Sequence, residues 1–367
     1  MPHVRTARRL CLAATITSLL CMAVCARASD VLLRHLYAVS ESDSDRGTVS
    51  IYDIDAGHRL IRTIRAVPNV SSVRGVAAST VTGKLYVAYH TSNASMIYCL
   101  DIYKNAVLWN RRVPVGIDRI SLNPNGRLIY APTGEDRNAD FIQILDADNG
   151  DIISRVYFSN HSHDAQYPLS GPLFQETKGD DGSGKYLYLI DPGTYAMLRV
   201  GPFAGTLGPY AVDSLSHYVV GNVARVWGMQ VADLKTGRII SAKIPGHPPG
   251  HYVGHGIGWT PDQREVWETG GDRDPHVYVW NMNDPMAPVL KQQLTLRSGR
   301  PGHWVTFDIR GDYAYIGPND TSNGTEIFSV ATHTSVGMIE ASEEMLEVDI
   351  SNGRISQIGD QFGIGRR

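Results

Sequence analysis

Apolar and polar positions alternate along this chain in short runs that are separated by turn residues. Residues 255–269 show the pattern clearly, because a run with apolar Ile257 and Trp259 reaches a turn at residues 260–263 and a second alternating run follows at once. Alternation with period two is typical of a strand with one buried face, and Pro and Asp between two such runs mark a turn. The stretch therefore predicts a β-hairpin.

The same phrase recurs elsewhere in the chain. Residues 75–83, 118–126 and 303–311 match it, and in each copy the residue that ends the turn stands eight positions after the first. A second phrase lies between these copies and consists of an Asp with Gly or Asn four positions later. Its copies are residues 53–57, 101–105, 146–150 and 233–237. We infer that the chain is a repeat array.

The spacing of the hairpin phrase decides the kind of array. Its first residue falls at positions 75, 118, 163, 208, 255, 303 and about 346, so successive copies are 43 to 48 residues apart. Units of roughly 40–50 residues with four short strands are typical of propeller blades, whereas helical repeats would show a 3.6-residue period. Residues 31–365 lack that helical period. Seven copies predict an all-β, seven-bladed β-propeller of four-stranded antiparallel blades.

The two ends of the array are each incomplete. Strands are expected at residues 36–39, 48–53 and 59–64, but no hairpin phrase precedes them, and nothing follows the last copy at residues 346–358 to complete a sheet. The strands missing from the first sheet can be supplied by those at the C-terminal end of the array. We expect the C-terminal strands to share a sheet with the N-terminal ones, which closes the ring and removes strand edges that invite aggregation.

Two units depart from the repeat. In the fourth, residues 170–185 are expected to form a polar, glycine-rich surface insertion that displaces the hairpin turn, without the residue order of a calcium loop. The fifth has a degenerate hairpin phrase. It leads into His247, His251 and His255, whose even spacing would suit a helix, but the intervening Pro and Gly residues favour an irregular loop.

Residues 1–28 have the pattern of an export signal. Arginines precede an apolar run at residues 10–24, and Ala26 and Ala28 stand at the spacing that a signal peptidase reads. The run is shorter than the ~20 apolar residues of a membrane anchor. We expect cleavage after Ala28 and a periplasmic or secreted location. The even repeats favour a single propeller domain over residues 29–367.

Removal of the signal changes the charge and the cysteine content. The mature chain keeps 30 basic and 37 acidic residues, a net charge of −7. Nucleic acids and anionic membranes need a basic face, so neither is expected as a partner, and no membrane span is expected after cleavage. Cys99 is the one cysteine left and lies in an apolar strand. We interpret it as a buried hydrophobe, since a lone cysteine forms no internal disulfide.

These motifs carry a family resemblance. The hairpin phrase, a following strand of the type Leu85-Tyr-Val-Ala or Leu128-Ile-Tyr-Ala, and the Asp-x-x-x-Gly turn resemble the YVTN-type seven-bladed β-propellers, a family of exported bacterial proteins. The resemblance covers residues 31–360 as a repeat pattern. Relatives of this architecture include lactonases, propeller subunits of quinoprotein amine dehydrogenases, copper-containing reductase domains and binding scaffolds. The resemblance therefore implies a fold and leaves the activity open, and no catalytic residue carries over.

Candidate chemistry lies where the repeat brings side chains together. The first strand of each propeller blade lines the central channel, so equivalent residues form a ring around the axis. At the first position of the phrase this ring holds Asp118, His163, His255 and His303, with glycine in two blades and Leu346 or Glu347 in the last. Neighbours of the ring are Arg74, Asp164, Tyr210 and Trp304. These residues stand at the same distance from the hairpin turn in each copy, and side chains alternate between the two faces of a strand. They are therefore expected to point in the same direction in each blade, unless a β-bulge lies between them and the turn.

Three interpretations of this ring stay open. Channel-lining residues are often polar simply because the channel holds water. Neutral imidazoles with a carboxylate also suit zinc, copper or iron, so His163, His255 and His303 are candidate ligands of a transition metal. The third interpretation is a metal-free pocket for an anionic ligand, or acid–base catalysis by one of the histidines.

The leading hypothesis is an exported binding or interaction module that holds a small molecule or a protein at the mouth of the channel. The alternative is an enzyme, either a lactone hydrolase or a metal-dependent oxidoreductase, that uses the ring of histidines and aspartate. The sequence contains no nucleophile elbow, P-loop, dinucleotide fingerprint, zincin motif or haem-attachment cysteine pair. It therefore identifies neither the ligand nor a reaction.

Overall fold

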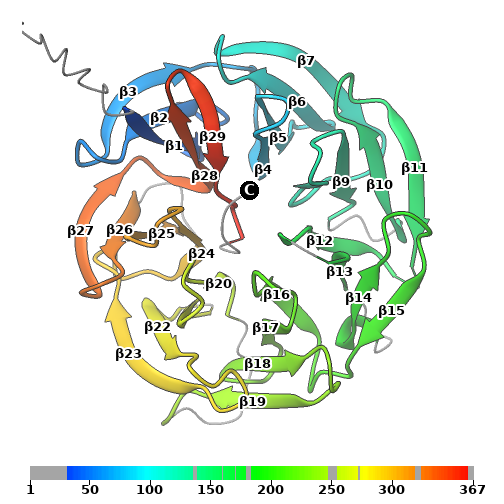
Figure 1. Cartoon of the computed structure of the whole chain (residues 1–367), viewed down its shortest axis with the longest axis vertical. Helices are drawn as coiled ribbons and strands as arrows, with labels where there is room; N and C mark the ends of the chain where they lie inside the picture. The colour runs from blue at the N-terminus through cyan, green and yellow to red at the C-terminus, as the bar shows by residue number, and fades with distance from the viewer. Residues whose placement is uncertain are drawn as a thin grey trace, which may run out of the picture. The chain divides into compact units, whose positions relative to one another are not determined.

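A computed structural model describes residues 31–134, 139–158, 160–169, 171–178, 183–246, 254–271, 273–318 and 324–362. The predicted export signal, His247 and His251 lie outside the described residues. Leu32–Arg367 form one compact unit. Within its described part the strands make seven antiparallel sheets arranged around a centre, so the all-β, seven-bladed prediction is confirmed (Figure 1). No helix among these residues is both long and apolar enough to span a membrane.

Each blade runs from an inner strand near the axis to an outer strand at the rim (Figure 1). Blade 1 contains β28 (Ser342–Ser351), β1 (Leu32–Ser40), β2 (Val49–Asp53) and β3 (Arg59–Ile64). Blade 2 contains β4 (Ser72–Ser79), β5 (Lys84–His90), β6 (Ser95–Asp101) and β7 (Ala106–Val113). Blade 3 contains β8 (Ser121–Leu122), β9 (Leu128–Pro132), β10 (Phe141–Asp146) and β11 (Ile152–Tyr157). Blade 4 contains β12 (Ser162–Gln166), β13 (Leu173–Thr177), β14 (Leu187–Ile190) and β15 (Met197–Val200), with the short 3-10 helix η1 (Ser183–Lys185).

The remaining blades follow the same plan. Blade 5 contains β16 (Leu207–Val212), β17 (Tyr218–Val223), β18 (Gly228–Asp233) and β19 (Ile239–Lys243). Blade 6 contains β20 (Ile257–Trp259), β21 (Glu265–Thr269), β22 (His276–Asn281) and β23 (Val289–Thr295). Blade 7 contains β24 (Gly302–Phe307), β25 (Tyr313–Pro318), β26 (Thr325–Ser329) and β27 (Thr334–Ile339). The last strand, β29 (Arg354–Ile358), pairs with β28 as a fifth strand of blade 1.

The turn geometry confirms the register that the hairpin phrase predicts. The residue eight positions after the first of each phrase has a positive φ in six blades: Gly83 (66°), Gly126 (68°), Gly171 (95°), Ser216 (56°), Gln263 (61°) and Gly311 (74°). This left-handed backbone is favourable for glycine and costly for most other residues. The degenerate phrase of blade 5 therefore keeps the backbone conformation of the others although it lacks their glycine.

The prediction of a surface insertion over residues 170–185 is wrong, because the stretch contains a regular strand. β13 occupies the middle of that stretch and pairs with both β12 and β14. The sequence of β13 does not alternate between apolar and polar residues, because both faces of the strand are buried. Its polar residues Gln175, Glu176 and Thr177 are therefore buried and do not face solvent. The hairpin turn of blade 4 stands in its regular place at Gly171. The connection from β13 to β14 is shorter than the predicted insertion.

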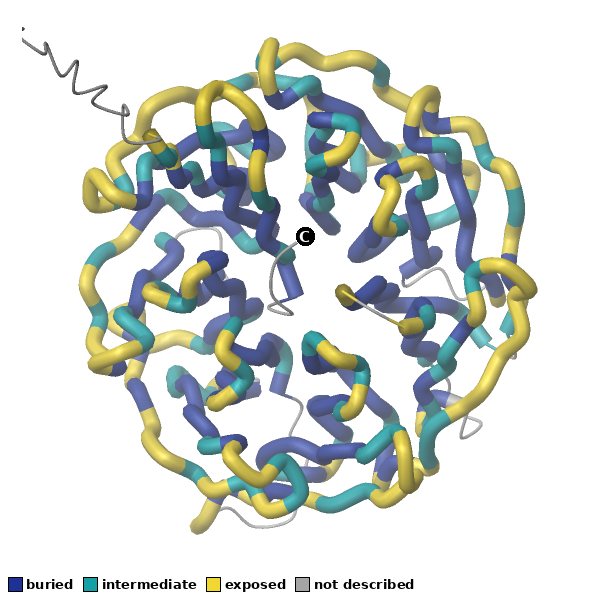
Figure 2. The backbone as a smooth tube through the Cα atoms, viewed as in Figure 1, coloured by how far each residue is buried: buried dark blue, intermediate teal, exposed yellow. Residues whose placement is uncertain are grey.

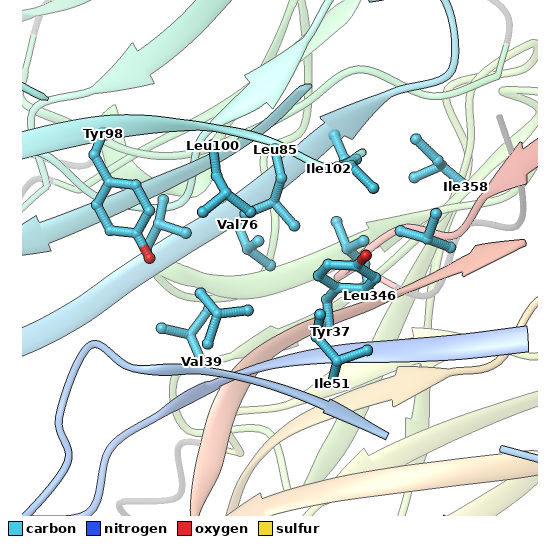
Figure 3. Close-up of a cluster of buried hydrophobic side chains, with 14 of the residues drawn as sticks. Tyr37, Val39, Ile51, Val76, Leu85, Tyr98, Leu100, Ile102, Leu346 and Ile358 are labelled. Carbon is cyan, nitrogen blue, oxygen red and sulfur yellow. The ribbon is translucent and has the colours of Figure 1, made fainter. Parts of the chain in front are cut away.

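The predicted closure of the ring is confirmed. β28 pairs with β1 along the whole of β1, from Ser351 opposite Leu32 to Ser342 opposite Ser40. The core between blades 1 and 2 contains side chains from both ends of the chain, and Figure 3 shows Tyr37 beside Leu346 in this cluster. The inner strand of blade 1 therefore comes from the C-terminal segment.

Burial falls from the axis to the rim. The outer strand β3 is exposed at five of its six residues, whereas β12 and β13 are buried throughout, and Figure 2 shows the same contrast around the ring. Cys99 is fully buried in β6 with no disulfide, and burial raises the pKa of its thiol to about 12, which confirms its interpretation as a hydrophobe. The polar side chains of β12 and β13 are therefore removed from bulk water.

Residues 359–362, which we call the plug, cross the channel. The Gln361 side chain accepts a hydrogen bond from the Val76 amide at 2.8 Å and donates one to the Ile120 carbonyl at 3.2 Å. Its own carbonyl accepts a hydrogen bond from Thr306 Oγ1 at 3.1 Å. These partners belong to blades 2, 3 and 7, so a single residue links three inner strands across the axis.

Candidate ligand-binding site

The inner strands of all blades run in the same direction, which gives the ring two distinct ends. We call the end where β4, β12, β16, β24 and β28 begin the start face, and the end where these strands reach their hairpin turns the turn face. In blades 2 to 7 the first residue of the hairpin phrase lies within three positions of the first residue of the inner strand. The repeat therefore brings the predicted ring of side chains to the start face.

β-Bulges recur at this position. The inner strand holds one residue more than its partner between Val73 and Gly75, Ser162 and Ala165, Leu207 and Tyr210, Gly302 and Val305, and Ser342 and Glu344. A bulge re-aims the side chains that it contains and is frequent next to functional sites. Arg74, His163, Asp164 and His303 all lie within these bulges. Because the irregularity falls at the same place in each strand, the repeat still relates these residues between blades.

The four ring residues meet as two pairs. Nε2 of His163 lies 3.5 Å from Oδ2 of Asp118, and the rings of His255 and His303 stack with centroids 3.7 Å apart and an angle of 28°. Nδ1 of His303 lies 2.7 Å from Glu343 Oε2. Burial lowers the pKa of His255 well below its usual range, and His303 and His163 add to this effect. Both pairs therefore share one electrostatic environment.

The arrangement gives no support to a metal centre. Among the residues that the structure describes, no group of three or more His, Cys, Asp or Glu side chains is arranged to hold a metal ion. The stacked rings of His255 and His303 direct their in-plane nitrogens along nearly parallel planes, whereas ligands of one ion converge on a point at ~2 Å. The three-histidine metal site stays a prediction.

Blade 4 contributes a buried acidic group that the ring did not include. Nδ1 of His163 lies 3.6 Å from Oε2 of Glu176, so this imidazole stands between Glu176 and Asp118. Burial raises the pKa of Glu176 well above its ordinary value, and it raises the pKa of Asp164 to about 7 although nearby Arg119 opposes the shift. Burial lowers the pKa of His163. The site therefore favours neutral forms of its acids and imidazoles.

Three cations surround this group. Arg119 is 3% exposed and stacks its guanidinium over Trp304 at 3.5 Å and over Phe362 of the plug at 4.4 Å. Its Nη2 lies 3.8 Å from Oε2 of Glu344, a buried acid whose pKa burial raises to about 8. Lys178 and Arg74 lower the pKa of His163 along with Arg119. Positive charge thus reaches the site from blades 2, 3 and 4.

Two of the predicted residues have other positions. Glu347 does not join the ring, since its Oε1 accepts a hydrogen bond from Arg34 Nε at 2.9 Å towards the turn face. In the closing strand the bulge contains Glu343 instead, because the shortened turn of β28 and β29 changes the offset. Tyr210 is buried between blades 4 and 5, and its hydroxyl donates to the Asp164 carbonyl at 3.4 Å. Tyr210 therefore contacts the backbone of a site residue and does not itself line the predicted ring.

Sequence reasoning missed Glu176, Arg119, Lys178 and Glu344. Glu176 and Lys178 fell in the stretch taken for an insertion, and recognising β13 by its pairing position would have found them. Arg119 directly follows Asp118, but its long side chain reaches the plug, which no repeat pattern predicts. Residues outside the repeat therefore complete the site.

The comparisons with known proteins agree on the architecture. No family model and no curated protein matches this sequence. A protein from Lactobacillus plantarum has a similar structure, with a TM-score of 0.66, 12% identity, and coverage of 86% of this chain and 99% of that chain. A putative 6-phosphogluconolactonase from Bacteroides fragilis gives a TM-score of 0.63, 12% identity, and coverage of 88% and 99%. The β-propeller domain of Myceliophteria thermophila Cps50 (Swd1) gives 0.58, 15% identity, and coverage of 78% and 96%.

At these identities the likeness shows the fold alone. The propeller part of the family resemblance is confirmed. The YVTN family itself is not assigned by these structures, which include both a putative enzyme and a domain described only as a propeller.

Proposed function

We propose that this protein is a ligand-binding propeller that holds a small molecule in the channel at its start face. One observation carries the proposal. Within the described residues, several buried polar atoms around the site have no hydrogen-bond partner: Asp164 Oδ1, Gln166 Oε1, Glu176 Oε1 and Oε2, Glu344 Oε2, Arg74 Nε and Arg119 Nε. A buried polar atom left unpaired costs about 1–3 kcal/mol. These atoms lie on the inner strands of blades 1, 2 and 4, on β13 and just before β8, and such a concentration of buried polar groups without protein partners favours a binding site.

A wet but purely structural channel is the competing explanation. Ordered water can complete buried polar groups, and it would give the same unpaired atoms. The two explanations differ in one measurable respect, because a ligand that binds only the folded state raises its stability in proportion to concentration.

The test is a thermal-shift screen of the mature chain with a broad library of neutral, cationic and anionic small molecules. We expect a concentration-dependent rise in Tm that is reduced in Glu176→Gln and Asp164→Asn. The matched control is Asp262→Asn, which alters a carboxylate that is 58% exposed in the hairpin turn of blade 6, at the opposite face. A complete absence of ligands that depend on Glu176 or Asp164 would contradict the proposal.

A second candidate function is hydrolysis, with a lactone as the substrate class. His163 stands between Asp118 and Glu176 at 3.5 and 3.6 Å, which is the kind of arrangement that general acid–base catalysis uses. A carboxyl group kept protonated by burial is also a usable general acid. The similar Bacteroides fragilis structure is described as a putative lactonase. Hydrolysis of a lactone panel that is lost in His163→Gln, with ligand binding retained, would establish this candidate.

We also propose that the chain is exported to the periplasm or secreted as a YVTN-type propeller. The arginines, the apolar run and the small residues before residue 29 support this proposal. A reporter fused to residues 1–35 should leave the cytoplasm, and the mature N-terminus should be at or near Ser29. Retention of the reporter in the cytoplasm would contradict export.

A further inference from the structure

We infer that the cavity at the turn face binds a small amphipathic amine, an alkylammonium ion with an apolar body. This cavity lies at the other end of the ring from the start-face site, so the inference goes beyond the proposed function and does not depend on it. Three features carry it: the size of the cavity, a buried carboxylate in its lining, and the apolar side chains that complete the lining.

The cavity is built by the hairpin turns of neighbouring blades. In blades 4 to 7 it is lined by the residue six positions after the first of the hairpin phrase: Leu169, Ser214, Pro261 and Ile309. Blade 1 completes the lining with residues of β1, β28 and β29, among them Leu32, Asp349 and Ser356. The cavity has a volume of about 610 Å³, which is within the range of ~300–1,000 Å³ typical of small-molecule sites.

Asp349 is a buried acid of this lining. It is 3% exposed, and its Oδ1 atom has no hydrogen-bond partner among the described residues. Gln357 stands directly opposite it on β29 and also lines the cavity. Residues opposite each other on paired strands direct their side chains to the same face of the sheet. The cavity therefore offers two neighbouring acceptor groups, a carboxylate and a side-chain amide, to a ligand with N–H or O–H donors.

The nearest guanidinium does not neutralise Asp349. Arg34 stands opposite Asp349 on β1, but its guanidinium contacts four other carboxylates: Glu347, Asp308, Asp55 and Asp312. Burial raises the pKa of both Glu347 and Asp308 to about 7. Even with these two acids protonated, three carboxylates remain beside one guanidinium. A ligand that brings a positive charge therefore improves the charge balance of this region.

The remaining charges of the lining lie at its exposed rim. Asp262 and Arg310 occupy the hairpin turns of the adjacent blades 6 and 7, are both exposed and carry opposite charges. Water screens them, and together they add no net charge. An anionic ligand would gain little at this rim and would be repelled by Asp349. A bare metal ion is also unsuited, because no three His, Cys, Asp or Glu side chains in the described part of the chain are arranged to hold one.

Apolar side chains complete the lining. Leu32 and Ile309 contribute from blades 1 and 7, and Leu169 and Pro261 belong to the turns of blades 4 and 6. They favour an alkyl or ring portion of the ligand, since burial of apolar surface drives binding. A primary ammonium at one end of that portion can donate to both acceptors on β28 and β29. An amine with a short apolar skeleton is therefore the class of ligand that matches both parts of the lining.

The experiment compares hexylamine, 1-hexanol and hexanoate, which share one carbon-chain length and differ in the end group. Each is titrated at neutral pH against the mature chain and followed by calorimetry and saturation-transfer NMR. We expect hexylamine to bind at least tenfold more tightly than the other two, because only its ammonium pairs with a carboxylate. Asp349→Asn, which keeps the shape of the side chain, should weaken hexylamine binding at least tenfold. The control Asp148→Asn removes a carboxylate that is 73% exposed and outside the lining, and it should leave binding unchanged.

A second pair of variants tests the site without altering a buried group. Ser356 is exposed and lines the cavity, so Ser356→Lys places a tethered ammonium there that should compete with hexylamine and weaken its binding at least tenfold. Ser356→Met adds a long side chain without charge and should retain binding. Thermal melting shows whether each variant is folded, and the Ser356 pair decides the question if Asp349→Asn is not.

The outcomes separate the ligand class from the site. Equal or tighter binding of 1-hexanol or hexanoate overturns the ligand class. Hexylamine binding that survives both Asp349→Asn and Ser356→Lys, or no binding of any probe, overturns the site. None of these results bears on Glu176-dependent ligands of the start face, so the proposed function is tested separately.

Discussion

Two buried clusters of ionisable side chains lie towards opposite faces of the ring, and they differ in how fully their polar atoms are paired. Towards the turn face, Arg34 is surrounded by carboxylates of Glu347 (2.9 Å), Asp55 (3.1 Å), Asp312 (3.3 Å) and Asp308. At the start face, Glu176 has no hydrogen-bond partner for either oxygen among the described residues. Both central side chains are nearly or fully buried.

The difference separates architecture from a binding site. The Arg34 cluster ties β1 to β28 and to the first turn of blade 7, so it fastens the point where the two ends of the chain meet. The Glu176 cluster leaves its hydrogen-bonding capacity unused. A buried network whose polar atoms are all paired helps to specify one structure. A network with unpaired polar atoms lowers the stability of the fold, so its retention favours a role in binding a ligand that pairs with those atoms.

The largest effect is expected from removal of residues 344–367. This deletion removes most of β28, which pairs with β1 along its length, and it removes Glu347 from the Arg34 cluster. It leaves an unpaired edge on blade 1 and an open ring. We expect no cooperative unfolding transition by circular dichroism or calorimetry. A truncated chain that melts like the full mature chain would show that the ring does not need this closure.

The next largest effect is expected for Arg34→Met. The substitution leaves Glu347 and Asp308 buried without their counter-charge, which typically costs about 3–5 kcal/mol. The free energy of unfolding, measured with urea at neutral pH, should fall by that amount. Arg264→Met is a suitable control because Arg264 and its partner Asp262 are 78% and 58% exposed, and surface pairs contribute little. Equal losses in the two variants would contradict the assignment of Arg34 as the closing residue.

The start-face cluster should make stability depend on pH. Burial raises the pKa of Asp164 from 3.8 to about 7, so between these values the folded chain holds a proton that the unfolded chain has released. Stability must then fall as pH rises through this window. We expect this decline to be smaller in Asp164→Asn, with a difference of about 3 kcal/mol between pH 4 and pH 7. Parallel profiles of the two proteins would argue against a protonated Asp164.

A smaller effect of opposite sign is expected for Glu176→Gln. The amide keeps the shape of the side chain and removes the free-energy cost of keeping a carboxyl protonated at neutral pH. We expect the free energy of unfolding to rise by about 1 kcal/mol while ligand binding is lost, as in other sites where function costs stability. A destabilised variant would mean that Glu176 has a structural partner.

The smallest effect is expected from metal removal. Since the His255 and His303 rings stack, we expect less than one equivalent of zinc, copper or iron in protein purified from its native compartment, and no change in Tm with a chelator. A stoichiometric metal that disappears in both His255→Ala and His303→Ala would establish the three-histidine site that the sequence predicts.

The sequence predicts the repeat well because the blade is a local structure. The eight-residue offset in the hairpin phrase reflects one backbone conformation, and it holds at Ser216 and Gln263 where glycine is absent. Closure was also predictable, since two incomplete sheets at the chain ends can only complete each other. The first inference depends on backbone pairing within a few residues, whereas the second joins residues as distant as Leu32 and Ser351 and follows from the number of strands.

The site was predictable only in part. The repeat offset brings Asp118 to His163 and His255 to His303, because equivalent positions of neighbouring blades meet at the axis. It fails for Glu347, where the shortened turn changes the register, and for Glu176, where a strand buried on both faces loses its alternation. Tertiary burial, and not local pattern, decides these two positions.

The plug separates the two faces of the ring, because Gln361 bonds to blades 2, 3 and 7 between them. The turn face has a cavity of about 610 Å³, lined in part by Leu32, Ile309 and Asp349. A molecule held in this cavity would lie on the other side of the plug from His163 and Glu176, so binding at one face need not block the other.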